Sequence, residues 1–193
     1  MHTLSSSFVL GYHGCDATAA ESLLAGDPFE PSDNNYDWLG PGIYLWEANP
    51  RRGLDYAKEL LARTKGSKIK KPAVVGAVIE LRRCLDLTTL AGIEQVRIAH
   101  AELMKLINAS GLEPPKNQPD GLRRNLDCAV IRHLHEIRKS QGQPAIDNVK
   151  GVFVEGAPIY ETAGFHEKTH IQICVCNPEC IKGVFRVANS FLI

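Results

Sequence analysis

Two turns rich in glycine place an imidazole and two aromatic rings where a ligand could reach them. His13 ends the apolar run FVLGYHG, and the glycine after it, Gly14, would let a ligand approach the backbone closely. Tyr44 and Trp46 follow the turn GPG, and in a strand they would share one face. Such a face serves as core or as a stacking wall for a planar ligand, and spacing alone does not choose between them. A single histidine is more often structural than ligand-binding.

The segment HIQICVC near the end of the chain has two unlike faces. Because side chains alternate along a strand, its aliphatic residues share one side, and its polar residues and thiols share the other. The aliphatic side is explained as core. The second side fits a strand that flanks a cleft, and it carries His170, Gln172, Cys174 and Cys176.

The same region is a dense run of potential metal ligands, namely His166, His170, Cys174, Cys176 and Cys180. Zinc usually takes four such ligands, with two sulfurs brought together by a Cys-x2-Cys turn. Here the closest pair is Cys-x-Cys, which in a strand separates the side chains by about 6.5 to 7 Å. We therefore expect no bound metal and interpret the thiols as small buried hydrophobic groups. A metal- or RNA-binding module, using these cysteines and the lysine loop KGSKIKK, is the weaker alternative.

Periodicity and turn residues predict the elements that position these groups. Strands are expected over 8–14 and 73–81 and in the three closing runs VKGVFVEG, HIQICVC and GVFRV. Helices are expected from Asp16 or Thr18 to Leu24, and over 51–64 behind an Asn49 N-cap. Residues 91–110 and 122–139 carry apolar side chains at helical spacing. Strands at both ends around central helices predict an α+β domain with mostly antiparallel sheet.

Composition limits the classes of function. The 193 residues fit one domain, and with 22 basic and 22 acidic residues the net charge is zero. A neutral chain has no global field that draws it to nucleic acid or membrane. No apolar run reaches the roughly 20 residues of a membrane span, and the first residues lack the pattern of a signal peptide. We expect a cytoplasmic protein with reduced cysteines and no membrane partner.

Three motifs, taken in chain order, resemble the ADP-ribosyltransferases, and more narrowly the His-Tyr-Glu group of diphtheria toxin and the poly(ADP-ribose) polymerases. They are GYHG, GIYLWE and QICVCNPECIKGVFRV, and the resemblance covers residues 8–60 and 150–190. The chain is also similar to a group of uncharacterised bacterial single-domain proteins with the blocks YDWLGPGIY and HIQIC. The resemblance implies a single domain, 1–193, of split antiparallel β-sheets flanked by helices, with residues 88–146 as a helical insertion.

The resemblance also implies a site for NAD. His13 would hold the adenine-side ribose, Gly14 would bind the carboxamide through its backbone, and the nicotinamide would lie against Tyr44. Tyr56 would be the second stacking ring, although its separation from Tyr44 is one residue longer than in the polymerases. Catalysis would rest on His13, Tyr44 and Gln172.

Gln172 departs from the family because it stands where the family has its catalytic Glu. An amide oxygen can accept a hydrogen bond from a ribose hydroxyl, but it carries no charge to stabilise an oxocarbenium-like transition state. A neighbouring carboxylate, Glu155 or Glu167, would then supply the charge, or turnover would be slow.

The function implied is an NAD-dependent ADP-ribosyltransferase that releases nicotinamide and modifies a macromolecular acceptor, either protein or nucleic acid. A bacterial toxin or defence effector, with an antitoxin as a further partner, is the expected setting. An NAD glycohydrolase and a catalytically inactive module that binds NAD or ADP-ribose are the alternatives.

Overall fold

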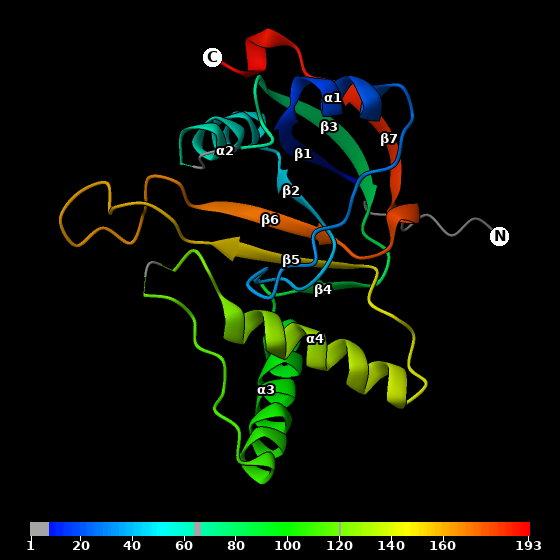
Figure 1. Cartoon of the computed structure of the whole chain (residues 1–193), viewed down its shortest axis with the longest axis vertical. Coiled ribbons are helices and arrows are strands. Elements are labelled where there is room, and N and C mark those ends of the chain that lie inside the picture. The colour runs from blue at the N-terminus through cyan, green and yellow to red at the C-terminus, as the bar shows by residue number, and fades with distance from the viewer. Residues whose placement is uncertain (1–7, 64–66, 120) are drawn as a thin grey trace.

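A computed structural model describes residues 8–63, 67–119 and 121–193, and its architecture is α+β, as predicted (Figure 1). Seven strands form one sheet in the order β4-β5-β6-β2-β1-β3-β7. Five of the six neighbouring pairs are antiparallel, and only β4 and β5 run parallel. The strands are β1 (Phe8–Asp16), β2 (Ile43–Glu47), β3 (Pro72–Glu80), β4 (Cys84–Asp86), β5 (Asn148–Phe153), β6 (His170–Val175) and β7 (Ile181–Arg186).

In the described ranges four α-helices accompany the sheet, at the positions that the sequence predicts. They are α1 (Ala17–Leu24), α2 (Pro50–Arg63), α3 (Leu90–Ser110) and α4 (Asn125–Ser140), and short 3-10 turns follow at Pro178–Cys180 and Asn189–Phe191. Asp16 caps α1 by accepting the Thr18 N–H at 3.0 Å. Asn49 caps α2 through the Arg52 N–H, also at 3.0 Å. The predicted end of the second helix, Thr64, lies outside the described residues.

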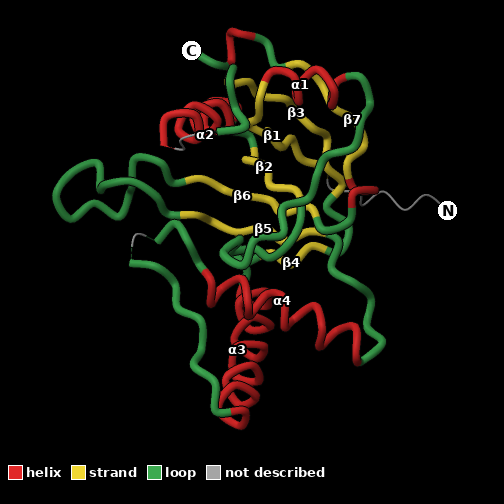
Figure 2. The backbone as a smooth tube through the Cα atoms, viewed as in Figure 1, coloured by secondary structure: helices red, strands yellow, loops and turns green. Residues whose placement is uncertain are grey.

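The sheet has a narrow seam between β1 and β2. These strands share two residue pairs, Gly11 with Glu47 and Tyr12 with Trp46, whereas β1 and β3 pair continuously from Phe8 to Asp16. The seam divides the sheet into one lobe of β4, β5, β6 and β2 and another of β1, β3 and β7. Strands of the two lobes run at a steep angle to each other (Figure 2). The split sheets implied by the resemblance are therefore one continuous sheet, held together by two pairs.

Each lobe carries its own helices. Helix α2 packs against β1 and β3, while α3 and α4 cover the β4-β5-β6 side. The core under α3 and α4 contains Leu39, Leu85, Ala99, Val130, Ile131, Leu134, Ile146, Val149 and Cys174. Because α3 and α4 connect the parallel strands β4 and β5, the segment predicted as an insertion forms the crossover that such a pair requires.

None of the helices in the described ranges is both long enough and apolar enough to cross a membrane.

Candidate functional site

The sheet brings the three motifs next to one another. His13 lies near the end of β1, Tyr44 in β2 and Gln172 in β6, and these strands are neighbours in the order β6-β2-β1. Trp46 of β2 pairs with Gln172 on one side and with Tyr12 on the other. Just beyond the seam, the His13 Nδ1 atom lies 2.9 Å from the Tyr44 carbonyl oxygen. Three strands that carry residues far apart in the sequence thus lie side by side.

The His13 and Tyr44 side chains nevertheless lie on opposite faces of the sheet, because Tyr12 pairs with Trp46 and His13, the next residue, points the other way. The His13 ring meets Phe29 edge-on at 5.4 Å, and burial lowers the pKa of this histidine. The Tyr44 ring packs against the core under α3 and α4. Its hydroxyl donates to the Gly40 carbonyl at 2.8 Å and accepts the Leu39 N–H at 3.0 Å, and burial raises its pKa. Tyr44 therefore fastens the turn before β2, and its contact with His13 runs through the backbone carbonyl.

Tyr56, the predicted second stacking ring, has Trp46 as its neighbour. Their ring centroids are 4.8 Å apart at an angle of 46°. The Arg52 guanidinium lies 5.8 Å from the Trp46 ring centroid and 5.9 Å from that of Tyr56. Burial raises the pKa of Tyr56. The aromatic wall of this region is thus built from β2 and α2, and it contains Trp46.

Gly14 is required by helix packing. A Cβ atom at this position would lie 1.9 Å from the Gly53 carbonyl oxygen of α2. The glycine was expected to allow the approach of a ligand, but here it allows the approach of a helix backbone.

Gln172 is held by Trp38, which no sequence motif singles out. The Trp38 Nε1–H donates to Gln172 Oε1 at 2.6 Å. Because an indole N–H can only donate, this contact fixes the amide with its oxygen toward Trp38 and its NH2 group on the other side. The Trp38 indole fits beside Gln172 because Gly151 has no side chain. A Cβ atom at Gly151 would lie only 2.7 Å from Trp38 Cη2.

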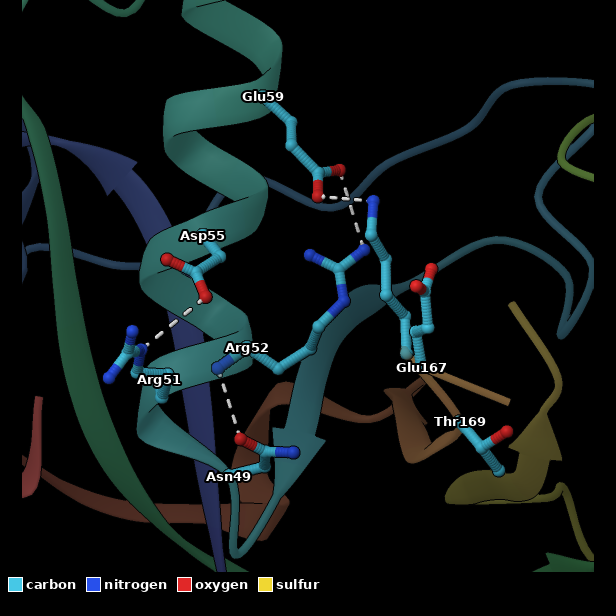
Figure 3. Close-up of a pocket in the computed structure, with 8 residues that line it drawn as sticks. Asn49, Arg51, Arg52, Asp55, Glu59, Glu167 and Thr169 are labelled. Atoms are coloured by element: carbon cyan, nitrogen blue, oxygen red, sulfur yellow. Dashed lines mark hydrogen bonds and ion pairs between the residues drawn. The ribbon is translucent and has the colours of Figure 1, made fainter. Parts of the chain in front are cut away.

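An ion-pair cluster lies beside the aromatic wall, between α2 and the segment joining β5 to β6. Arg52 contacts Glu155 at 2.8 Å and Glu59 at 3.5 Å, and Lys168 contacts Glu59 at 2.8 Å and Glu155 at 3.9 Å. Figure 3 shows the Arg52 guanidinium pointing along α2 to the Glu59 carboxylate. We call these four residues the ionic cluster. Arg52 and Glu59 are seven positions apart, about two helical turns, and this spacing was the available sequence signal.

Glu155 and Glu167, the two carboxylates expected to assist Gln172, differ in their surroundings, because only Glu155 belongs to the ionic cluster. The Glu155 side chain is 10% exposed and shares its charge with Arg52 and Lys168. Glu167 is exposed, and its Oε2 accepts the Ala157 N–H at 3.3 Å. Glu155 is therefore the buried carboxylate at this end of the sheet, and its charge is already compensated.

Two pockets border the ionic cluster. One, of about 190 Å³, lies between α2 and residues 167–169 and is lined by Asn49, Arg51, Arg52, Asp55, Glu59, Glu167, Lys168 and Thr169 (Figure 3). The other, of about 430 Å³, lies beyond Glu155 and Lys168 and is lined by these two residues together with Arg63, Leu122, Val154, Gly156 and His166. All the side chains that line the first pocket are polar or charged, whereas the second pocket mixes polar side chains with Leu122 and Val154.

The cysteines differ sharply in their environments. The neighbouring Cys174 and His135 side chains lower the pKa of Cys176 to about 6. Burial raises the pKa of Cys84 to about 12. All six cysteines are free thiols, and in the described ranges no three or more His, Cys, Asp or Glu side chains gather closely enough to hold a metal ion.

The comparisons with known proteins identify a distant relative. An uncharacterised protein of the archaeon Methanocaldococcus jannaschii is 25% identical over 189 residues, covering 89% of this chain and 83% of that protein. No family model matches the chain. No solved structure matches it either.

Proposed function

We propose that this protein is an NAD-dependent ADP-ribosyltransferase. The observation that carries the proposal is the adjacency of β6, β2 and β1, which places Gln172, Tyr44 and His13 on three neighbouring strands. The imidazole of His13, fixed by the Tyr44 carbonyl, would bind the adenine-side ribose of NAD where β1 and β2 diverge.

The reaction breaks the bond between C1′ of the ribose and the nicotinamide nitrogen, and the bonding electrons leave with neutral nicotinamide. A nucleophilic atom of the protein or nucleic-acid acceptor then bonds to C1′ and loses its proton to solvent. Positive charge develops on the ribose in between, so polar groups arranged in advance lower the barrier. Gln172 would hold the ribose in place, without supplying charge.

The matching experiment follows nicotinamide release and the transfer of labelled ADP-ribose from NAD to proteins and RNA of a cell extract. The His13→Ala variant should lose both, because the ribose loses its imidazole partner. The exposed His100→Ala variant on α3 serves as a control and should retain both. Nicotinamide release with water as the acceptor, and no labelled macromolecule, would instead indicate a glycohydrolase.

One observation favours a catalytically inactive binding module as the second candidate. Gln172 Oε1 already accepts a bond from Trp38, and the nearby Glu155 is paired with Arg52 and Lys168, so no uncompensated carboxylate is identified beside Gln172. ADP-ribose binding without nicotinamide release, in the presence of a full extract, would establish this candidate over the transferase.

A further inference from the structure

Three buried side chains around the ionic cluster have polar atoms that the fold does not satisfy. Trp46 is 2% exposed, His170 5% and Arg52 7%. For Trp46 Nε1, His170 Nε2, and Nε and Nη1 of Arg52, no hydrogen-bond partner exists within the part of the chain that the structure describes. Buried polar groups in native structures nearly always have a hydrogen-bond partner, so the accumulation of unpaired groups in one place calls for a ligand.

The three side chains lie together. The Arg52 guanidinium is 5.8 Å from the Trp46 ring centroid, and the Trp46 and His170 ring centroids are 6.1 Å apart. They come from α2, β2 and β6, so they sit on the same side of the sheet as the Trp46–Gln172 pair. The pocket of about 190 Å³ adjoins them, because Arg52 and the neighbour of His170, Thr169, both line it.

The unsatisfied atoms define the hydrogen bonds that a ligand must make. Arg52 and Trp46 can only donate. His170 Nδ1 lies 2.5 Å from the Lys168 carbonyl oxygen, which can only accept, so the proton is on Nδ1. Burial lowers the pKa of His170, which keeps the ring neutral and leaves Nε2 as an acceptor. The matching group therefore accepts from Arg52 or Trp46 and donates to His170.

The hydrogen-bond pattern argues against an anion as this group. A deprotonated oxygen can accept from Arg52 or Trp46, but it has no hydrogen to donate to His170 Nε2. A neutral hydroxyl can do both.

We propose that Trp46, Arg52 and His170 form a subsite for a sugar hydroxyl, namely a hydroxyl of the nicotinamide-side ribose. The assignment to this ribose rests on the proposed function, in which Gln172 binds the nicotinamide-side ribose. Gln172 lies two residues from His170, on the same face of β6. The hydroxyl oxygen accepts from the Arg52 and Trp46 N–H groups, and its hydrogen is donated to His170 Nε2.

The test compares ADP-ribose, which retains this ribose after nicotinamide has left, with ADP, which lacks it. Calorimetry on the whole protein should show tighter binding of ADP-ribose than of ADP. Trp46→Phe keeps a ring but removes the N–H, and His170→Phe removes the acceptor. Each variant should weaken ADP-ribose binding by about tenfold and leave ADP binding unchanged. His133→Phe is the matched control, because His133 Nε2 is also unsatisfied but lies on α4.

The outcomes separate this inference from the proposed function. Equal binding of ADP and ADP-ribose by the wild-type protein, or unchanged ADP-ribose binding in both variants, overturns the subsite even where nicotinamide is released. Nicotinamide alone binding in a manner that depends on Trp46 and His170 also overturns it, since the group bound would be a carboxamide. Absence of nicotinamide release, with ADP-ribose binding still dependent on both residues, removes the transferase and supports the subsite.

Discussion

Arg52 of α2 donates to the Glu155 carboxylate at 2.8 Å, and the two side chains are 8% and 10% exposed. The pair joins residues 103 positions apart in the sequence and fastens the segment after β5 to the helix after β2. A buried guanidinium that loses its partner remains charged in the low-dielectric interior, which is unfavourable. The pair therefore holds α2 and the segment after β5 together.

Glu155→Gln should therefore lower the free energy of unfolding by about 2 to 3 kcal/mol, with Glu59 at 3.5 Å limiting the loss. Urea unfolding measures the change. The control is Glu21→Gln, which breaks a pair with Arg186 whose side chains are 64% and 68% exposed, and it should cost less than about 1 kcal/mol. Equal small losses in both variants would show that Arg52 does not depend on Glu155.

Gly14→Ala should destabilise the protein by at least about 1 to 3 kcal/mol, because its Cβ atom would overlap the Gly53 carbonyl oxygen and force α2 away from β1. Gly183→Ala on β7 provides the comparison, since nothing lies within 4 Å of the added methyl group. Thermal unfolding should show a lower midpoint for the first variant and little change for the second. A Gly14→Ala protein as stable as wild type would contradict the described packing of α2.

Gln172→Glu should maintain or increase nicotinamide release from NAD. The carboxylate can still accept the Trp38 N–H, and the charge of Glu155 is compensated by Arg52 and Lys168, so a second charge meets little repulsion. Gln172→Ala should slow release by roughly 30- to 150-fold, as expected for a loss of about 2 to 3 kcal/mol of transition-state binding. Gln141→Glu, at an exposed position after α4, is the control. Release that is indifferent to every change at position 172 would remove this residue from the site.

Acidification should weaken the fold through two histidines. Burial lowers the pKa of both His13 and His170, whereas in the unfolded chain each returns to about 6.5. Below that value the unfolded state binds protons that the folded state does not, so the free energy of unfolding falls as pH falls. Each histidine contributes at most about 1.4 kcal/mol per pH unit. Urea unfolding between pH 7.5 and 5 should show a smaller slope for His13→Gln and for His170→Gln than for wild type, and equal slopes would refute the prediction.

Cys176 should be the first thiol alkylated by iodoacetamide at pH 7. Its pKa of about 6 makes it mostly thiolate there, whereas Cys84, which is similarly half-buried, has a pKa of about 12. Below pH 6 the Cys176 rate should fall about tenfold per pH unit. Peptide mapping by mass spectrometry distinguishes the two sites, and faster modification of Cys84 would contradict the lowered pKa of Cys176.

Local signals account for what the sequence predicts correctly. Apolar side chains at helical spacing identify α3 and α4, and the Asn49-Pro50 pair identifies the start of α2. Each signal concerns neighbours in the chain, where the geometry follows from the backbone alone.

Contacts between distant residues were not predictable in this way. Trp38 and Gln172 are 134 positions apart, and no periodicity in either segment implies their hydrogen bond. The glycine after His13 was recognised as an unusual position, but its purpose depends on where α2 packs. The ionic cluster likewise requires the segment between β5 and β6 to fold back onto α2, which is a property of the tertiary structure.

The parallel pairing of β4 with β5 has a consequence for shorter versions of this chain. The two strands point the same way, so no tight hairpin can replace α3 and α4 between them. Excising these helices would also uncover Leu39, Val149 and Cys174, which are fully buried beneath them. A homologue that lacks the helical segment must therefore lose β4 or reverse its direction. It must also carry polar residues on the face of the sheet that α3 and α4 cover here. Because α3 and α4 connect β4 to β5, related chains that differ in length here should gain or lose β4 together with both helices.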